Sequence, residues 1–477
     1  MFLLLLTLGA VLVHGYHPWA EDAEIYLPGV EKTLHPELFP FGSEFFQNHA
    51  NLTLFPNVLA TVVRVTHLPL EWVLFLLHLG SIFLLLWACW ELSGRCFTSL
   101  KVRWSGVALV ATLLTLPVAG TALYVMDQYS NPRNLSAFAL VFAVERALGR
   151  RYVAAGIFLA LGLAIHPFMS MFGVLLCLIL VWMDRFGRAG LSAFLLLPFG
   201  IVLDPPSPAY HEVALSHPFH YVLRWQWYEL VGMFAPVLIL WWFGFRARSS
   251  GQLRLRLLCR ALIPYELACA AAALMLSVPA RFESLARLQP QRSLHLLYII
   301  FVLVAGGFLA EYVLLKRVWR WAAFFVPLCL GMYFAQRALF PASAHVEWPG
   351  SRPLSPWVQA FVWIRENTPV DAVFALNPFH MQAAGEDANG FRAIAQRSML
   401  ADAVKDSGAV TMFPPLAEEW QRQVRAQKGW KTFQISDFQR LRREFGVTWL
   451  VLEQPGVAGT HCVFRNNAVM VCPNVIP

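Results

Sequence analysis

The sequence predicts an all-α polytopic membrane bundle followed by a small C-terminal α/β domain. Of the 477 residues, 58% are hydrophobic and 14% are aromatic, whereas only 14% are charged. These fractions lie outside the range of soluble globular proteins. Apolar runs recur from residue 1 to about residue 340. Each run is near the roughly 20 residues that a helix needs to cross the hydrocarbon core, so we expect about eleven transmembrane helices.

Nine apolar runs are clear by this criterion. They are Leu70–Leu92, Trp104–Val125, Arg151–Ile165, Pro167–Met183, Ala189–Leu203, Tyr228–Phe245, Ala261–Pro279, Ser293–Leu315 and Trp321–Phe340. Two further runs are weaker, because one is short and the other carries Glu145 and Arg146. These are Met1–His14 and Asn134–Gly149. We interpret the first as a retained helix rather than a cleaved signal, since it lacks a basic n-region and an A-x-A site before His17.

The distribution of Lys and Arg predicts the orientation. One set of loops collects most of these residues, at 95–103, 146–151, 185–188, 246–260 and 316–320. Cytoplasmic loops retain positive charge, so this set is predicted to be cytoplasmic. With an odd number of helices the N-terminus is then also cytoplasmic, and everything after Phe340 lies outside. The net charge of +8 is therefore a topology signal, and no nucleic-acid partner is expected.

The composition changes at "FPASAHVEWPGSRPLSPW", where Pro, Ser and Gly separate the last apolar run from a more polar tail. We place the domain boundary near Pro341. Residues 1–340 form the predicted membrane domain, with an acidic first outer loop at 15–69, and residues 341–477 form the α/β domain. Helical spacing covers Trp357–Asn367, residues 414–427 and residues 436–446, the last with Ser436 or Asp437 as its cap and Gly446 as its stop. Residues 372–378 and 447–454 are typical of buried strands.

Two of the eight cysteines differ from the others, which lie in or beside apolar helices. Cys462 and Cys472 flank "VFRNNAVMV", which alternates like two short strands around a turn at Asn466–Asn467. Such a hairpin could place the two cysteines opposite each other. An extracytoplasmic compartment permits a disulfide between them.

The usual catalytic motifs of soluble enzymes are missing from the sequence, so any chemistry must come from scattered loop residues. Glu21, Asp22 and Glu44 are prominent in the acidic first loop, whereas Glu31 and Glu37 fit an ordinary solvated loop. Asp22 lies among aromatic and apolar neighbours that could partly bury it. Partial desolvation would suit a general base acting on a hydroxyl, with Glu21 as its alternate.

Three other outward segments carry candidate binding residues. Pro132 begins a helix just before Asn134, so Arg133 and the first free N–H groups could receive an anion near Asp127. Arg292 opens an apolar helix on the side that positive charge normally avoids, which suggests a phosphate partner. His166 precedes a proline in an apolar run, where it could line a cavity or be a satisfied structural histidine.

Together these features resemble the GT-C type of polytopic membrane glycosyltransferase and its uncharacterised bacterial relatives. The resemblance rests on the acidic first outer loop, "DQYSNPRNLS" in the second, "AIHPF" in mid-bundle, "QRS" before a late helix, and a C-terminal outer domain opening "WVQAFVWIRENTPVDAVF". It covers nearly the whole chain in architecture. It implies a multi-pass protein of a bacterial inner membrane, with the C-terminal domain in the periplasm or outside the cell.

In that family the first outer loop supplies an Asp or Glu that acts as base or binds metal, and polyprenyl-phosphate sugars are the usual donors. By position the role falls on Asp22 or Glu21, and Arg133 and Arg292 become candidates for the lipid phosphate. The first loop has no D-x-D or E-x-D pattern, so a divalent metal is possible but not required. The acceptor could be a glycan, a lipid or a protein, and membrane lipids are further partners.

Two alternatives belong to other classes. A transporter or flippase of lipid-linked or small solutes would place ionisable residues near the bilayer midplane, where this sequence has few. A non-catalytic membrane scaffold would use the tail to bind a partner.

The loop charges predict the topology in a testable way. A reporter enzyme fused after Phe340 should be active outside the cytoplasm, and one fused within Arg246–Arg260 should be active inside. Paired alkaline phosphatase and green fluorescent protein fusions measure this directly. A tail found in the cytoplasm would contradict both the orientation and the transferase interpretation.

Overall fold

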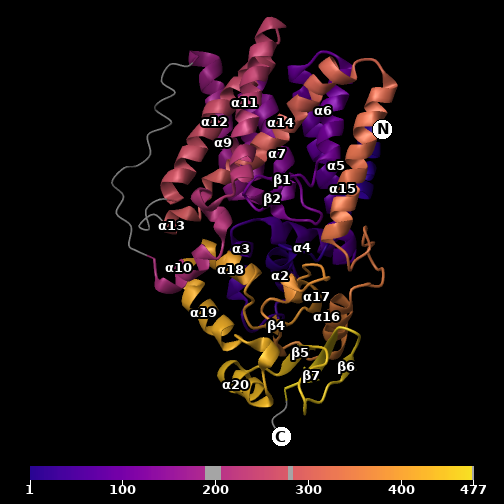
Figure 1. Cartoon of the computed structure of the whole chain (residues 1–477), viewed down its shortest axis with the longest axis vertical. Coiled ribbons are helices and arrows are strands. Elements are labelled where there is room, and N and C mark those ends of the chain that lie inside the picture. Colours follow the sequence, from indigo (N-terminus) through magenta and orange to yellow (C-terminus); the bar gives the residue numbers. More distant parts are fainter. Residues whose placement is uncertain (188–205, 278–282, 475–477) are drawn as a thin grey trace. The chain divides into compact units, whose positions relative to one another are not determined.

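The computed structural model describes residues 1–187, 206–277 and 283–474, and their contacts form two compact units (Figure 1). Unit 1 comprises Met1–Gly15, Leu76–Pro206 and Ala214–Ala335. Unit 2 comprises Tyr16–Phe75, Ser207–Val213 and Gln336–Pro477. Unit 2 thus combines most of the predicted first outer loop with the predicted C-terminal domain.

Unit 1 is a helical bundle with one small hairpin. Its helices are α1 Phe2–His14, most of α5 Leu70–Cys96, α6 Leu100–Thr112, α7 Pro132–Leu148, α8 Tyr152–Ile165, α9 Pro167–Phe186, α11 Trp227–Ser249, α12 Leu253–Ser277, α13 Glu283–Ala286, α14 Ser293–Leu309 and most of α15 Val318–Leu339. A π-helical segment, Ala310–Leu314, extends α14. Within the bundle α7 packs against α8 and α9, α6 against α14, and α11 against α12.

Among the described residues, six helices are long and apolar enough to cross a membrane. They are α5, α9, α11, α12, α14 with its flanking segments, and α15. Each coincides with a predicted apolar run, so the chain has the helices of an integral multi-pass membrane protein. α1 and α8 are shorter apolar helices of 13 and 14 residues. The predicted helix Ala189–Leu203 lies outside the described residues.

The predicted helix Trp104–Val125 is wrong in its second half. α6 ends at Thr112, and the chain then forms the hairpin of β1 Pro117–Val118 and β2 Leu123–Tyr124. The hairpin turn contains Gly120 at φ +59°, a conformation that a helix cannot contain. A Cβ at Gly120 would also come within 2.3 Å of the Trp225 ring, so the glycine permits this close contact. Apolar composition alone could not show this break.

Two glycines set the close approach of α6 and α14. A Cβ on Gly106 would come within 2.6 Å of the Leu303 carbonyl oxygen, and a Cβ on Gly306 would come within 2.8 Å of the Ser105 carbonyl oxygen. Small residues at facing positions let helix backbones pack closely in a membrane, where dispersion replaces the hydrophobic effect as the driving force. Larger side chains at either position would separate the two helices.

Unit 2 contains short helices around a five-stranded mixed sheet. Its helices are α2 Ala23–Leu34, α3 Glu44–Asn51, α4 Phe55–Thr66, the start of α10 Pro208–Leu215, α16 Pro356–Asn367, α17 Phe391–Ala395, α18 Lys405–Met412, α19 Ala417–Ala426 and α20 Ile435–Phe445. The strands are β3 Val373–Ala375, β4 Ser398–Met399, β5 Trp449–Glu453, β6 Phe464–Arg465 and β7 Val469–Pro473. Their order is β4-β3-β5-β7-β6. β3 pairs in parallel with β4 and β5, whereas β7 is antiparallel to β5 and β6.

Alternating side chains of the sheet enter two separate cores. Val451 packs with Phe361 of α16 on one face, whereas Leu450 and Leu452 pack with Phe438 of α20 on the other. This period of two is the expected consequence of strand geometry. The predicted strands at 372–378 and 447–454 are therefore confirmed in type but are shorter than predicted.

The predicted cap of α20 is wrong by two or three residues. The N-cap is Gln434, and Asp437 at the third helical position accepts a hydrogen bond of 3.0 Å from the Gln434 backbone N–H. This reciprocal arrangement is a capping box. At the other end Gly446 has φ +71° and forms the C-cap, as predicted.

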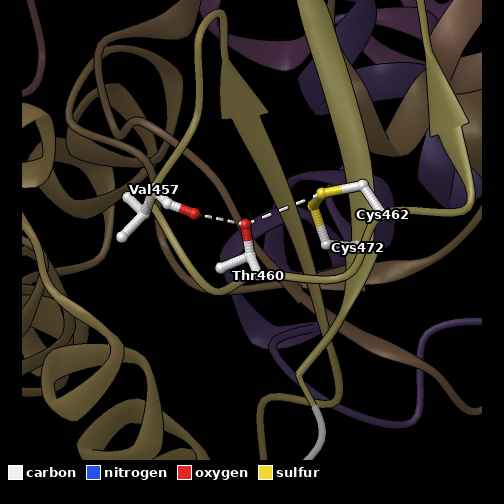
Figure 2. Close-up of a disulfide and its surroundings, with 4 residues drawn as sticks. All are labelled: Val457, Thr460, Cys462 and Cys472. Carbon is white, nitrogen blue, oxygen red and sulfur yellow. Dashed lines mark hydrogen bonds between the residues drawn. A yellow bond between two sulfur atoms is a disulfide. The ribbon is translucent and has the colours of Figure 1, made fainter.

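Strands β6 and β7 form a hairpin around the Asn466–Asn467 turn, and a disulfide joins Cys462 to Cys472. Figure 2 shows the bond beside Thr460, whose hydroxyl donates to the Val457 carbonyl oxygen at 2.7 Å. Cys472 is fully buried in β7, so the bond links the segment before β6 to an inner strand of the sheet.

We expect the disulfide to steady unit 2 without being essential. Its sequence separation is 10, and the chain-entropy estimate for so short a loop is roughly 2–3 kcal/mol. Peptide mapping without reduction should recover the linked peptides, and the Cys462→Ser and Cys472→Ser double variant should unfold with about that loss. Thr460→Val is the matched control, because it changes a neighbour and keeps the bond. Two free thiols in the mature protein would contradict the prediction.

Candidate active site

Glu21 and Asp22 precede helix α2 in unit 2, where both contact one cation. The Lys405 ammonium donates to Asp22 Oδ1 at 2.9 Å and also to Glu21 Oε2. The Lys405 side chain is 13% exposed, whereas those of Glu21 and Asp22 are 45% and 28% exposed. The cation is therefore enclosed, and both carboxylates remain partly open to solvent.

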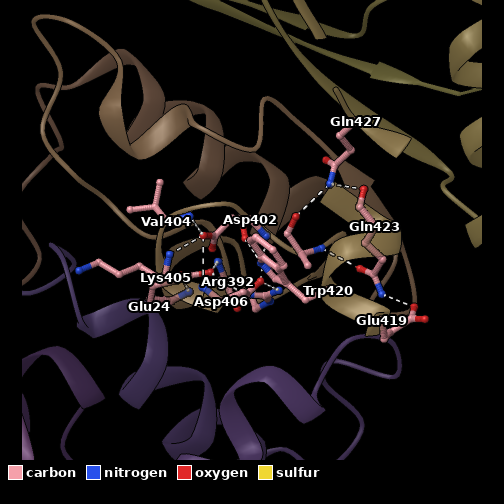
Figure 3. Close-up of polar contacts among 12 residues, drawn as sticks. Glu24, Arg392, Asp402, Val404, Lys405, Asp406, Glu419, Trp420, Gln423 and Gln427 are labelled. Carbon is pink, nitrogen blue, oxygen red and sulfur yellow. Dashed lines mark hydrogen bonds and ion pairs between the residues drawn. The ribbon is translucent and has the colours of Figure 1, made fainter. Parts of the chain in front are cut away.

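Asp402 positions Lys405 at the start of α18. Its Oδ1 accepts hydrogen bonds from the backbone N–H groups of Val404 and Lys405, at 2.6 Å and 2.5 Å (Figure 3). This is how a carboxylate satisfies the unpaired donors of a helix N-terminus. Burial opposes the positive charge on Lys405, but Asp22 and Glu21 together raise the pKa of Lys405 well above its ordinary value. Lys405 therefore stays charged at any physiological pH.

A buried arginine, Arg392 of α17, pairs with one carboxylate of α2 and one of α18. Arg392 is 1% exposed, and its guanidinium donates to Asp406 through two bonds of 3.0 and 2.8 Å and to Glu24 at 3.3 Å. Glu24 also accepts 3.0 Å bonds from the backbone N–H groups of Arg392 and Ala393. Gly390 leaves room for this carboxylate, because a Cβ there would come within 2.3 Å of Glu24 Oε2.

This buried cluster has more acids than cations. Burial raises the pKa of Glu24 to about 8, although Arg392 and the two backbone donors oppose the rise. Burial likewise raises the pKa of Asp406 to about 6 against the opposing charge of Arg392. Removing one partner of such a buried ion pair typically costs about 3–5 kcal/mol. We conclude that the Arg392 cluster is a structural support and that Glu21 and Asp22 are the accessible carboxylates beside it.

The carboxylates of the first loop do not form a metal site in this conformation. Within the described ranges 1–187, 206–277 and 283–474, no group of three or more His, Cys, Asp or Glu residues is arranged to hold a metal ion. Near Glu21 and Asp22 the ammonium of Lys405 occupies the position between the two carboxylates. The donor set thus fits a lysine counter-ion rather than a divalent cation, and we derive no step through a metal.

Asp127 and Arg133, two predicted binding residues of unit 1, are bound to each other. The Arg133 guanidinium donates to Asp127 Oδ2 at 2.6 and 3.2 Å, and Asn131 Nδ2 donates to the same oxygen at 2.7 Å. Both charged side chains are buried, at 4% and 3% exposure. Asn131 also caps α7 through Asn134 N–H, so this loop is held by a network that begins with the predicted helix start at Pro132.

His166, Arg292 and Glu44 lie at helix starts. His166 is buried, and its Nδ1 accepts a long 3.4 Å bond from the Met169 backbone N–H at the N-terminus of α9. Arg292 is half-buried at the N-cap of α14 in unit 1. Glu44 is half-buried in the first turn of α3 in unit 2. Substrate-binding roles for all three stay predictions.

The expectation that Glu31 lies in a solvated loop is wrong. Glu37 is exposed, but Glu31 is 2% exposed within α2, where Oε1 accepts a 3.1 Å bond from Gln396. In the part of the chain that the structure describes, Glu31 Oε2 has no hydrogen-bond partner. Residues 16–75 are acidic partly because two of their carboxylates, Glu24 and Glu31, enter the interior of unit 2.

Sequence reasoning missed Lys405, Arg392, Asp402 and Asp406. One signal was present, because Asp402 stands three residues before Lys405 in "DAVKD" and could have been recognised as a helix cap. The partners could not be recognised, since Arg392 is 368 positions from Glu24 in the sequence. Long-range ion pairs leave no periodic pattern.

No protein-family model and no curated protein matches this sequence. Solved structures of an oligosaccharyltransferase from Archaeoglobus fulgidus are distantly similar. The apo crystal structure is 14% identical over 94% of this chain and 69% of that chain, with a TM-score of 0.43. The enzyme AglB in complex with an inhibitory peptide and a dolichol-phosphate is 12% identical over the same shares, with a TM-score of 0.44. A third structure, tethered by a disulfide to an acceptor peptide containing the NVT sequon, is 14% identical over 94% and 68%, with a TM-score of 0.47.

Glu31 makes the stability of unit 2 depend on pH. Burial raises the pKa of Glu31 well above its ordinary value, so the folded state holds a proton that the unfolded state releases. This stabilising contribution is complete below the unfolded pKa of about 4.3 and is lost as pH rises through the folded pKa. Glu31→Gln, which resembles the protonated acid, should raise the free energy of unfolding at pH 8 by roughly 1–3 kcal/mol.

Thermal unfolding of the purified protein between pH 5 and pH 8 measures this effect. Glu37→Gln is the matched control, because that carboxylate is exposed on the same loop. A flatter pH dependence in Glu31→Gln alone is the expected result. Equal curves for the two variants would contradict the assignment.

Proposed function

We propose that this protein is an integral membrane glycosyltransferase that moves a sugar from a polyprenyl-phosphate-linked donor to an acceptor at the extracytoplasmic face. The observation that carries the proposal is the pair of partly exposed carboxylates, Glu21 and Asp22, held by the enclosed ammonium of Lys405. A multi-pass helical unit suits a donor that is delivered from the bilayer. The acceptor then arrives from water, where these carboxylates are accessible.

Asp22 is the proposed general base. It is less exposed than Glu21, and a partly desolvated carboxylate is the better proton acceptor. The acceptor hydroxyl gives its proton to Asp22 while its oxygen forms a bond to the anomeric carbon of the sugar. The bond from that carbon to the phosphate oxygen breaks, and the polyprenyl phosphate leaves with the electron pair.

Lys405 is the proposed positioning residue. Its ammonium orients Asp22, and Asp402 accepts hydrogen bonds from the backbone N–H groups of Val404 and Lys405 where α18 begins. Arg292 and Arg133 remain our candidates for the donor phosphate, each within unit 1. Arg133 is buried against Asp127, and Arg292 is half-buried at the N-cap of α14.

Substitution of the two carboxylates tests the proposal. Asp22→Asn keeps the shape of the side chain but cannot take a proton, so transfer should fall by about 10²–10⁴-fold with donor binding nearly intact. Glu37→Gln should keep full activity, because this exposed carboxylate lies on the same loop and outside the ion cluster. The assay uses membranes supplied with labelled polyprenyl-phosphate sugars. Full activity in Asp22→Asn and Glu21→Gln alike would refute the proposal.

Two further variants separate the roles of the basic residues. Lys405→Met should move the acid side of the pH–rate profile to higher pH, a change that a purely structural lysine would not produce. Arg292→Ala should instead weaken donor binding, by about 1.5–3 kcal/mol if it makes a charge-assisted bond to phosphate.

A further inference from the structure

Unit 2 contains a cavity that none of the catalytic candidates lines. Its volume is about 210 Å³, which is room for about seven waters at ~30 Å³ each. The walls come from five segments, namely Tyr16 with Pro18 and Trp19, Glu71 at the start of α5, the loop 344–354, α16, and Ile394 of α17. Glu21, Asp22 and Lys405 are not among the lining residues. The cavity therefore calls for a separate explanation.

The loop 344–354 is held in place by backbone pairing with the first loop. Tyr16 N–H donates to the His345 carbonyl oxygen, and Glu347 N–H donates to the Tyr16 carbonyl oxygen, both at 3.0 Å. Gly350 N–H donates to Glu71 Oε2 at 3.0 Å, and Gly350 has φ +76°, which favours glycine there. The walls are thus formed before any ligand arrives, which reduces the entropy cost of binding.

The lining combines aromatic faces with polar and charged side chains. Trp19 and Trp348 contribute indole rings, and Trp348 is 57% exposed while its ring packs 5.3 Å from that of Phe75. The charged lining residues are two carboxylates and two guanidiniums, Glu71, Glu347, Arg352 and Arg365. Because burial keeps Glu347 mainly protonated near pH 7, the charged lining groups at that pH are the Glu71 carboxylate and the two guanidiniums.

Glu347 pairs with a buried histidine beside the cavity. Its Oε1 lies 3.0 Å from His17 Nδ1, and His17 stacks on Phe340 with ring centroids 3.8 Å apart. Burial, together with the charge of Asp387, raises the pKa of Glu347 to about 8, and burial lowers the pKa of His17 to about 4. The pair is therefore neutral overall near pH 7. A neutral carboxyl can both give and accept a hydrogen bond with a hydroxyl.

These features disfavour an acyl chain as the ligand, because it would bury charged groups without pairing them. A ligand with an apolar ring face and many hydroxyls matches both the indole rings and the polar side chains of the lining. The ring face stacks on an indole, and the hydroxyls pair with the carboxylates and guanidiniums.

We propose that this cavity binds one neutral pyranose residue of a glycan. The cavity volume suits a single ring, and a longer chain would leave through its open side. The site goes beyond the transfer reaction, because the proposed base Asp22 and its alternate Glu21 do not line the cavity. Its function is then to retain an acceptor or product glycan on unit 2.

Direct binding to the purified full-length protein in detergent tests this proposal without any donor. The probes are the methyl pyranosides of glucose, galactose, mannose and N-acetylglucosamine and the corresponding disaccharides, followed by calorimetry and by tryptophan fluorescence. At least one probe should bind saturably. Trp348→Ala should weaken its binding by about threefold to tenfold, through loss of the stacking face. Glu71→Gln should weaken it by about tenfold, through loss of a charged acceptor.

Two matched controls accompany these variants. Trp227→Ala removes a 75% exposed indole of unit 1 that does not line the cavity, and Glu366→Gln neutralises an exposed carboxylate next to Arg365. Both should bind the probe like the unaltered protein. Trp348→Tyr keeps an aromatic face and should retain most of the affinity, which separates stacking from misfolding.

The outcomes distinguish this proposal from the transferase proposal. Saturable binding with loss in Trp348→Ala supports the cavity even if Asp22→Asn leaves transfer unchanged. No saturable binding of any probe, or equal affinity in Trp348→Ala and Trp227→Ala, overturns it. Tighter binding of glucose 1-phosphate than of methyl glucoside also overturns it, because the cavity would then select the phosphate.

Discussion

Unit 2 depends on the contact between Arg392 and the two acids that surround it, Glu24 and Asp406. Taking these charges out of water is unfavourable, and only a nearly complete set of partners offsets the cost. Glu24 accepts from two backbone N–H groups as well as from the guanidinium, so α2 is fixed against α17. The same contact sets the position of α18, whose first residue is Lys405. The orientation of the accessible carboxylates therefore follows from a cluster that itself does no chemistry.

The acids of the first loop serve two different purposes. Glu24 and Glu31 face the interior of unit 2, where burial disfavours their charged forms. Glu21 and Asp22 are partly exposed and pair with the enclosed ammonium of Lys405. A segment of 60 residues thus contains structural and accessible carboxylates within one helical turn of each other, at Glu21, Asp22 and Glu24. Composition does not distinguish the structural carboxylates from the accessible ones, whereas their contacts in the folded protein do.

Periodic features of the fold were predictable from sequence, and contacts between distant residues were not. The helix at Pro167 was predicted to its first residue, because an apolar run and a proline at the first helical position are local signals. Residues 104–125 misled the prediction, since apolar composition continues through a hairpin whose turn depends on Gly120. Asp22 and Glu21 were recognisable as candidates, but their counter-ion Lys405 lies 383 positions away from Asp22. No pattern within a sequence window can encode that pairing.

The distance along the chain between Glu24 and Arg392 has a consequence for biosynthesis. The two residues are separated by 368 positions, and synthesis proceeds at about 5–20 residues per second, so Glu24 waits roughly 20–75 s for its partner. During that interval burial of the Glu24 carboxylate would be unfavourable, because its partner Arg392 has not yet been made. We therefore expect the Glu24 side chain to stay hydrated while the apolar helices emerge, and its contact with Arg392 to form only when the tail is made. A chain truncated before Arg392 would keep its membrane helices and lose the assembled unit 2.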